Sequence, residues 1–145
     1  MPLIHPKLML FAIVTSVLTG CLPHKSPNQV YIEYNSKVIG GIDYDEEKAY
    51  YSKRKQQEVE LKVPQYMEQM KKSREEVIEF YVNFSRAVAK CKELTLVSEV
   101  INGNTSILEY SQKDICGNES TSKEKQVIYM VEENGWKLDR VEISL

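Results

Sequence analysis

The sequence predicts an α+β domain in which N-terminal helices pack on a curved four-stranded antiparallel sheet. Two observations carry this prediction. Apolar side chains recur at helical spacing between residues 73 and 90, whereas the segment after Cys91 alternates like strands and contains two Asn-Gly turn pairs. Because helices precede a meander of strands, we expect the helices to cover the concave face of a single sheet.

Two helices are expected before the sheet. Residues 43–62, DYDEEKAYYSKRKQQEVELK, place acidic side chains early and lysines late, as the helix dipole favours, and Pro64 is expected to end this helix. The second helix is expected over residues 74–90. Ser73 and Glu76 have the spacing of a capping box, and apolar residues then repeat along one helical face.

Four strands are expected after the second helix. The pairs Asn102, Gly103 and Asn134, Gly135 predict two hairpin turns. In the last strand the apolar positions change phase after Leu138. A bulge near residues 139–140 is therefore expected to restore the register and bend the strand.

Residues 1–20 have the pattern of a secretory signal. Lys7 precedes an apolar run, residues 8–18, that is too short to span a hydrocarbon core of about 30 Å. The following Leu-Thr-Gly-Cys resembles the lipobox of bacterial lipoproteins. In that family the signal is cut before the cysteine, whose sulfur carries diacylglycerol and whose amino group is usually acylated. Cys21 is thus the expected lipid-attachment residue; the alternatives are a plain signal peptide with a chance cysteine and an uncleaved anchor.

The chain is expected to be anchored to a membrane without spanning it, since no other apolar run is long enough. Residues 21–42 are expected to form the lipidated N-terminus and a tether, and residues 43–145 the folded domain. Enterobacterial lipoproteins retained in the inner membrane carry aspartate after the lipidated cysteine. Leu22 resembles the outer-membrane class instead, which places the domain in the periplasm.

Cys91 and Cys116 remain once Cys21 is assigned to the anchor. An exported chain meets oxidising conditions, so the pair is expected to form a disulfide between the end of the second helix and a later loop. Such a bridge stabilises the fold by roughly 3 to 4 kcal/mol in the chain-entropy model. Two free buried thiols are the alternative. The spacing is not that of a redox-active C-x-x-C pair.

Composition and motifs argue against several classes of function. The net charge is −2, and charged residues of both signs are interspersed without a basic patch, so nucleic acid is not an expected partner. His24 is the one histidine after the signal, which argues against a catalytic triad and against a zinc site. The acidic run DYDEE lacks the glycine and the later glutamate of a calcium loop. We therefore expect no metal, cofactor or catalytic residue.

The C-terminal half combines four features: a helix that ends in cysteine, the hairpin NGNTSILEY, the loop DICGN and a closing hairpin around ENGWKLD. In these features residues 73–145 resemble small bacterial lipoproteins with a nuclear transport factor 2-like, cystatin-like domain of unknown function. The resemblance implies a cone-shaped domain, and it carries over no catalytic residue.

Tyrosines are the candidate site residues. Some enzymes of the resembled fold perform proton chemistry inside the cone, which makes Tyr110 and Tyr129 candidates for lining a cavity; core packing is the alternative. Five of the nine tyrosines precede residue 52 and either pack back on the sheet or form a partner surface. They are Tyr31, Tyr34, Tyr44, Tyr50 and Tyr51.

The leading hypothesis is a non-enzymatic, lipid-anchored envelope protein whose domain binds a protein partner or a small apolar ligand. A small enzyme or ligand-processing protein that uses the cone is the first alternative, and a structural subunit of an envelope or secretion assembly is the second. An enzyme requires a polar group with a shifted pKa in an accessible pocket, whereas a binding module requires an exposed apolar patch. The oligomeric state stays open.

Overall fold

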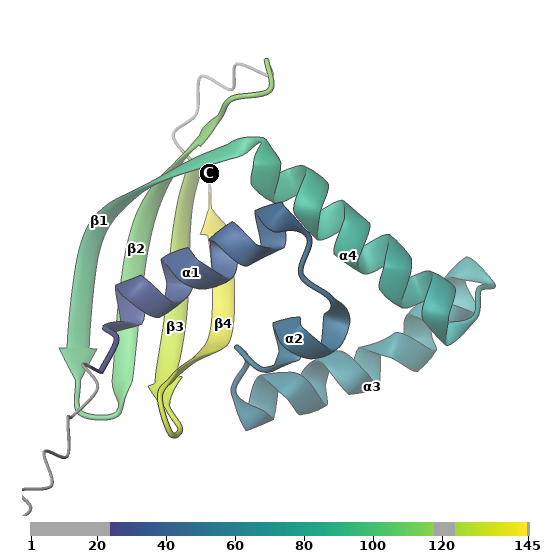
Figure 1. The fold of residues 1–145 in the computed structure, drawn as a ribbon, viewed down its shortest axis with the longest axis horizontal. Coiled ribbons are helices and arrows are strands. Elements are labelled where there is room, and N and C mark those ends of the chain that lie inside the picture. Colours follow the sequence, from purple (N-terminus) through teal and green to yellow (C-terminus); the bar gives the residue numbers. More distant parts are fainter. Residues whose placement is uncertain (1–23, 118–123, 145) are drawn as a thin grey trace, which may run out of the picture.

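The computed structural model describes residues 24–117 and 124–144. These residues form an α+β domain in which helices are followed by a four-stranded antiparallel sheet of order β1-β2-β3-β4, as predicted (Figure 1). The helices are α1 (Pro27–Gly40), α2 (Tyr44–Lys48), α3 (Lys53–Met70) and α4 (Arg74–Lys90). The strands are β1 (Lys92–Asn102), β2 (Thr105–Asp114), β3 (Glu124–Glu132) and β4 (Trp136–Ser144).

Helix α1 occupies most of the segment expected to be a tether, residues 21–42, and corrects that prediction. Ser26 and Gln29 form a capping box, in which each side chain accepts a hydrogen bond from the backbone N–H of the other. The buried Tyr31 then packs on the sheet. The helix ends at Gly40 and is capped by Gly41, whose φ of 100° suits a residue without Cβ.

The single helix expected over residues 43–62 is two helices, because the chain touches the sheet between them. Ser52 N–H donates to the Leu138 carbonyl at 2.7 Å, and Leu138 N–H donates to the Tyr50 carbonyl at 2.8 Å. The Ser52 hydroxyl then caps α3. The expected stop at Pro64 is also wrong, since α3 continues to Met70. Packing of α3 against α4 outweighs the hydrogen bond that proline removes.

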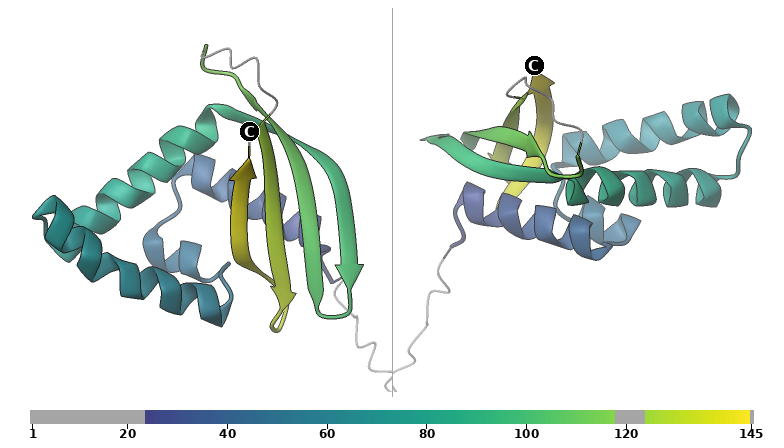
Figure 2. Two further views of the ribbon diagram at one scale, coloured as in Figure 1. Left: turned by 180° about the vertical axis from the view of Figure 1, so that it is seen from behind. Right: turned by 90° about the horizontal axis from the view of Figure 1, so that it is seen from above.

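The sheet confirms both predicted hairpins and the predicted bulge. Tyr129 pairs with Arg140, whereas Met130 pairs with Leu138, so Asp139 is the extra residue. A second irregularity lies in β1, between Leu96 and Ser98. The resulting sheet is strongly twisted, and α1 lies across one of its faces (Figures 1 and 2).

The core lies between α1 and the inner face of the sheet. Large side chains from β2, β3 and β4 meet two tyrosines from the helical part. Its members are Tyr31, Tyr51, Leu108, Tyr110, Ile128, Met130, Trp136 and Leu138. Helices α3 and α4 extend away from this core and from the sheet, meet at their connecting turn and diverge towards the strands (Figures 1 and 2).

Candidate functional site

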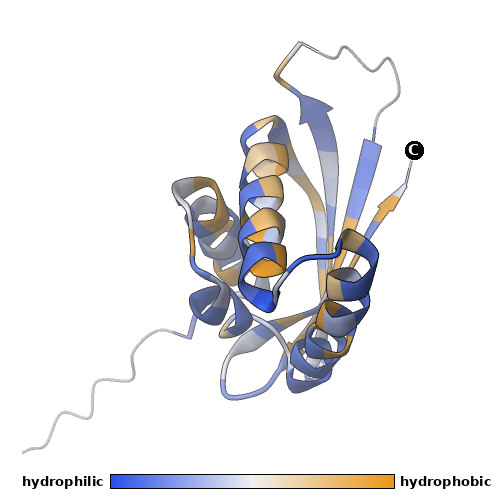
Figure 3. Ribbon diagram, turned by 90° about the vertical axis from the view of Figure 1, so that its right-hand side faces the viewer, coloured by the Kyte–Doolittle hydropathy of each residue, from blue (hydrophilic) through white to orange (hydrophobic). Residues whose placement is uncertain are grey.

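A pocket of about 600 Å³ lies between α1, α3, α4 and the sheet. Most of its lining is aliphatic or aromatic, and α3 and α4 contribute the largest share. In Figure 3 hydrophobic residues recur along α4, whereas α3 is mostly hydrophilic and has hydrophobic residues at intervals. The apolar lining consists of Val38, Val59, Val63, Met70, Val77, Ile78, Phe80, Phe84, Val88, Ala89, Leu94 and Val141, together with the rings of Tyr31, Tyr34, Tyr44, Tyr66 and Tyr81.

Helix α4 forms one wall of the pocket, and the α4 residues that line the pocket lie on two neighbouring faces of the helix. Ser73 and Glu76 form the predicted capping box, and the helix runs over the predicted residues 74–90. Val77 points inward and is buried. Phe80 and Phe84 lie one turn apart with ring centroids 6.1 Å from each other, and they remain 55% and 59% exposed. These two rings stand at the opening of the pocket, where an apolar occupant would cover them.

Helix α3 forms the opposite wall through a stripe of residues three or four positions apart. Lys55, Val59, Val63 and Tyr66 all line the pocket. Val63 is buried, whereas the preceding apolar residue Leu61 is 73% exposed and lies outside the pocket lining. Helix α3 is therefore amphipathic across the pocket, with an isolated leucine on its outer side.

A buried carboxylate lies behind the tyrosines of the pocket. Glu47 is 1% exposed and accepts hydrogen bonds through Oε1 from the hydroxyls of Tyr51 at 2.6 Å, Tyr34 at 2.9 Å and Tyr81 at 3.4 Å. Burial raises the pKa of all three tyrosines, and the negative charge of Glu47 raises it further. The hydroxyls are therefore protonated donors at neutral pH. Tyr34 and Tyr81 line the pocket, while Glu47 and Tyr51 do not.

Two polar groups of the pocket lining have no protein partner among the described residues. The buried amide oxygen of Gln126 on β3 accepts no hydrogen bond. The Lys55 ammonium has neither an ion pair nor a hydrogen bond, and lies 5.2 Å from the centroid of the Tyr51 ring. Burial lowers the pKa of Lys55 below its ordinary value.

The five N-terminal tyrosines do not form one partner surface. The partner-surface alternative is wrong for Tyr31 and Tyr51, which are buried. Tyr31 and Tyr51 are 3% and 2% exposed and belong to the core. Tyr34 donates to the buried Glu47 carboxylate. Tyr44 and Tyr50 are partly exposed, and their hydroxyls donate to glutamates of neighbouring helices. Packing, the other alternative, describes Tyr31 and Tyr51.

The candidate cavity pair lies on opposite faces of the sheet. Tyr110 is fully buried on the inner face and donates to the Asn28 side chain at 2.5 Å. Tyr129 pairs across the ladder with Ile107, an odd number of residues from Tyr110, and so points to the outer face. There its ring lies 3.9 Å from the Arg140 guanidinium carbon. Neither tyrosine lines the pocket, so the cavity prediction is wrong for both.

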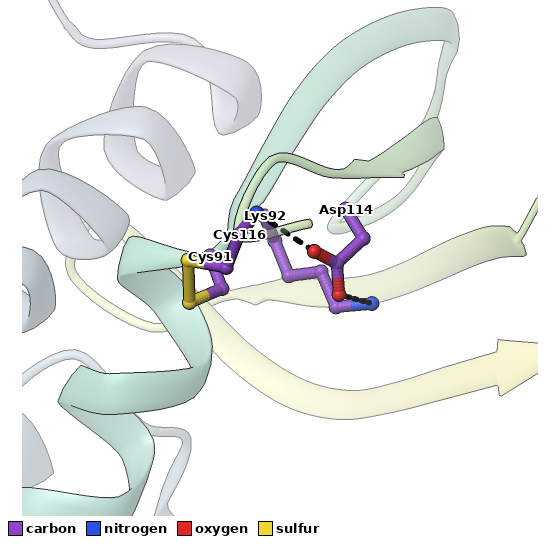
Figure 4. Close-up of a disulfide and its surroundings, with 4 residues drawn as sticks. All are labelled: Cys91, Lys92, Asp114 and Cys116. Atoms are coloured by element: carbon purple, nitrogen blue, oxygen red, sulfur yellow. Dashed lines mark hydrogen bonds and ion pairs between the residues drawn. A yellow bond between two sulfur atoms is a disulfide. The ribbon is translucent and has the colours of Figure 1, made fainter. Parts of the chain in front are cut away.

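A disulfide joins Cys91 at the end of α4 to Cys116 after β2, as predicted (Figure 4). Asp114 supports the joint, because its Oδ1 accepts from the Cys116 N–H at 2.8 Å and its Oδ2 lies 3.8 Å from the Lys92 Nζ. The Cys91 carbonyl accepts from the Ile115 N–H at 2.9 Å. The bridge therefore anchors the α4 wall of the pocket to the sheet.

The remaining predicted residues lie outside the pocket. Cys21, the expected lipid-attachment residue, lies outside the described residues. His24 is exposed, and its ring nitrogen lies 3.3 Å from Glu132. The part of the chain that the structure describes contains no helix long and apolar enough to cross a membrane. It also contains no cluster of histidine, cysteine and acidic side chains with the arrangement of a metal site.

Sequence reasoning missed three residues that shape this site: Glu47, Lys55 and Gln126. Each belongs to a charged or polar stretch with no motif, and each becomes distinctive only through the element that covers it. The comparisons add no further assignment: no family model, no curated protein and no solved structure matches this chain.

Proposed function

We propose that this protein is a lipid-anchored envelope protein whose domain binds a small apolar ligand in the pocket between α1, α3, α4 and the sheet. The main support for this proposal is the pocket itself. Its volume of about 600 Å³ lies in the range of roughly 300 to 1,000 Å³ that is typical of small-molecule sites. Its walls are mainly apolar, and partner-free polar groups are few. An occupant would bury apolar surface that is now in water.

The exposed aromatics favour a ligand that enters from the α3–α4 side. Tyr66, Phe80 and Phe84 line the pocket and are each about half exposed. Exposed aromatic rings that lie together do not help to keep a protein in solution, and such apolar patches usually mark a binding site. A bound apolar molecule would cover them and stabilise the diverging α3–α4 pair.

The anchor and the fold family belong to the same proposal. The lipobox-like residues 18–21 support acylation of Cys21, and Leu22 in place of aspartate supports attachment to the outer membrane on its periplasmic side. Helices followed by a twisted antiparallel sheet, with a pocket between the two, support a nuclear transport factor 2-like domain. Binding beside a membrane suits a ligand that partitions between bilayer and protein.

Fluorescence of N-phenyl-1-naphthylamine, a neutral apolar probe, tests the binding proposal. The sample is the mature chain, residues 21–145 with Cys21→Ser, so that no acyl chain competes. Phe84→Ala is expected to weaken probe binding about tenfold, because it removes roughly 1 to 2 kcal/mol of apolar burial. Leu61→Ala is the matched control and leaves affinity unchanged, since Leu61 lies outside the pocket. No probe binding, or equal loss in both variants, contradicts the proposal.

An enzyme is the second candidate, and the Glu47 cluster favours it. Tyr34 and Tyr81 present hydroxyls at the pocket, backed by a buried carboxylate. Because each hydroxyl already donates its one proton to Glu47, it offers an acceptor lone pair towards a substrate, and a tyrosine–carboxylate cluster of this kind could take up a proton from a bound substrate. The two candidates differ in one result. An enzyme returns a chemically altered ligand from the pocket after incubation, and mass spectrometry of extracted ligand detects it, whereas a binding protein returns the ligand unchanged.

A further inference from the structure

Lys55 is an unusual residue for the wall of an apolar pocket. It lies on α3 in line with Val59 and Val63, and its side chain is half-buried. Placing an ammonium group in such surroundings costs free energy unless an anion compensates it. Among the described residues no carboxylate lies within ion-pair distance of Lys55, and its ammonium lies over the face of the Tyr51 ring.

The nearby acidic groups are engaged with other cations. Glu58 pairs with Arg54 at 3.1 Å and with Lys62 at 2.6 Å, both one helical turn away. Asp139 on β4 accepts from Arg54 Nε at 2.9 Å and from the Ser52 hydroxyl at 2.6 Å. Lys62, the second lysine of the α3 wall, is therefore paired, whereas Lys55 is not. Among the described residues, Lys55 is therefore the lysine of the α3 wall whose ammonium has no ion pair.

We infer that the pocket takes a single-chain amphiphile with a carboxylate head group, of the long-chain fatty acid class, and that Lys55 is the counter-charge for that head group. This inference rests on the proposed function. The apolar walls formed by α3 and α4 receive the chain, and the Lys55 ammonium receives the carboxylate. The head group then replaces the missing acidic partner of Lys55 in a partly desolvated position, where charge-assisted hydrogen bonds are strong.

The charge balance favours a carboxylate over a phosphate. In the part of the chain that the structure describes, Lys55 is the one cation of the lining without an ion pair, and Glu58 lies on the same wall. A singly charged head group therefore matches the site, whereas a dianionic phosphate would leave excess negative charge next to Glu58. The lowered pKa of Lys55 agrees with an ammonium that lacks a partner, and a bound carboxylate is expected to raise it.

Displacement of N-phenyl-1-naphthylamine by dodecanoate and by dodecanol tests the inference on the mature chain with Cys21→Ser. The two ligands share chain length and differ in charge. We expect dodecanoate to bind about tenfold more tightly than dodecanol, as one charge-assisted contact in a half-exposed position provides. Lys55→Met is expected to abolish this preference, and continued binding of dodecanol by the variant shows that it is folded. Lys55→Arg keeps the preference.

Lys62→Met is the matched control, because it removes a lysine that lines the same wall but is already paired. It is expected to keep the preference for dodecanoate. Equal affinity of dodecanoate and dodecanol in the unsubstituted pocket, or equal loss in the Lys55→Met and Lys62→Met variants, overturns the inference while the binding proposal stands. If dodecanol and the probe both fail to bind, the proposed function itself fails.

Discussion

Tyr51 is the residue on which the buried cluster around Glu47 depends most. Its hydroxyl donates the shortest hydrogen bond to the carboxylate, 2.6 Å, and lies 3.3 Å from the Tyr34 hydroxyl and 3.1 Å from the Tyr81 hydroxyl. The substitution Tyr51→Phe removes this one oxygen and keeps the ring in the core. We therefore expect it to destabilise the domain without altering its fold.

The expected loss follows from the burial of both partners. A hydrogen bond to a charged group contributes about 1.5 to 3 kcal/mol, and water cannot replace the hydroxyl because Tyr51 is 2% exposed. A loss of about 2.5 kcal/mol follows. The unfolding entropy is about 2.1 cal/mol/K per residue, or about 0.25 kcal/mol/K for roughly 120 residues, so the melting temperature is expected to fall by about 10 °C.

Thermal unfolding followed by circular dichroism measures this shift, with Tyr50→Phe as the control. The Tyr50 hydroxyl also donates to a glutamate, Glu33 at 2.8 Å, but the side chain is partly exposed. Water therefore replaces the lost partner, and a change below about 0.5 kcal/mol is expected. Equal shifts in the two variants would refute the view that burial gives the Tyr51–Glu47 hydrogen bond its weight.

Three further predictions concern stability. Replacing both Cys91 and Cys116 by alanine is expected to lower the free energy of unfolding by about 3.5 kcal/mol in urea, as their separation of 25 residues implies; an unchanged midpoint would contradict the chain-entropy account. Gly41→Ala is expected to cost about 1 to 2 kcal/mol through its φ of 100°, and the new Cβ would also displace the Arg86 guanidinium, whereas Gly40→Ala in open space costs nothing; equal effects would contradict this account. Hydrogen bonds, first from Arg74 and then from Lys48, lower the pKa of Glu60 from 4.5 to about 2, so its contribution is present above pH 4.5 and is lost as the pH falls towards 2. In urea unfolding between pH 2 and 5, Glu60→Gln is expected to reduce the loss of unfolding free energy as the pH falls. An unchanged loss would show that the interactions of Glu60 with Arg74 and Lys48 contribute nothing to stability.

The elements with short-range signals were predictable from sequence. Helix α4 was expected over the residues it occupies, because the Ser73 capping box and the apolar repeat act within one or two turns. The hairpins and the extra residue Asp139 were equally local, since an Asn-Gly pair and a change of phase both lie within a few residues. The disulfide was predicted from the oxidising conditions that an exported chain meets and from the even number of cysteines left after Cys21, not from geometry.

The site was not predictable, because long-range contacts create it. Two helices replaced one where Tyr50 and Ser52 bond to Leu138, nearly ninety positions later in the chain. The faces of Tyr110 and Tyr129 depended on strand register, which no single strand reveals. Glu47 and Lys55 looked like ordinary charges of a solvated helix, and only the layers packed around them distinguish them.

If Cys21 is acylated as proposed, the start of helix α1 limits how far the domain can lie from the membrane. It begins at Pro27, so residues 22–26 alone separate its first residue from Cys21. Fully extended, that stretch spans at most about 20 Å. With Cys21 acylated as proposed, the first residue of helix α1 stays within this distance of the lipid-attachment point, so the domain stays next to the bilayer that holds its acyl chains. Ligand exchange with that bilayer is then a transfer over a short distance.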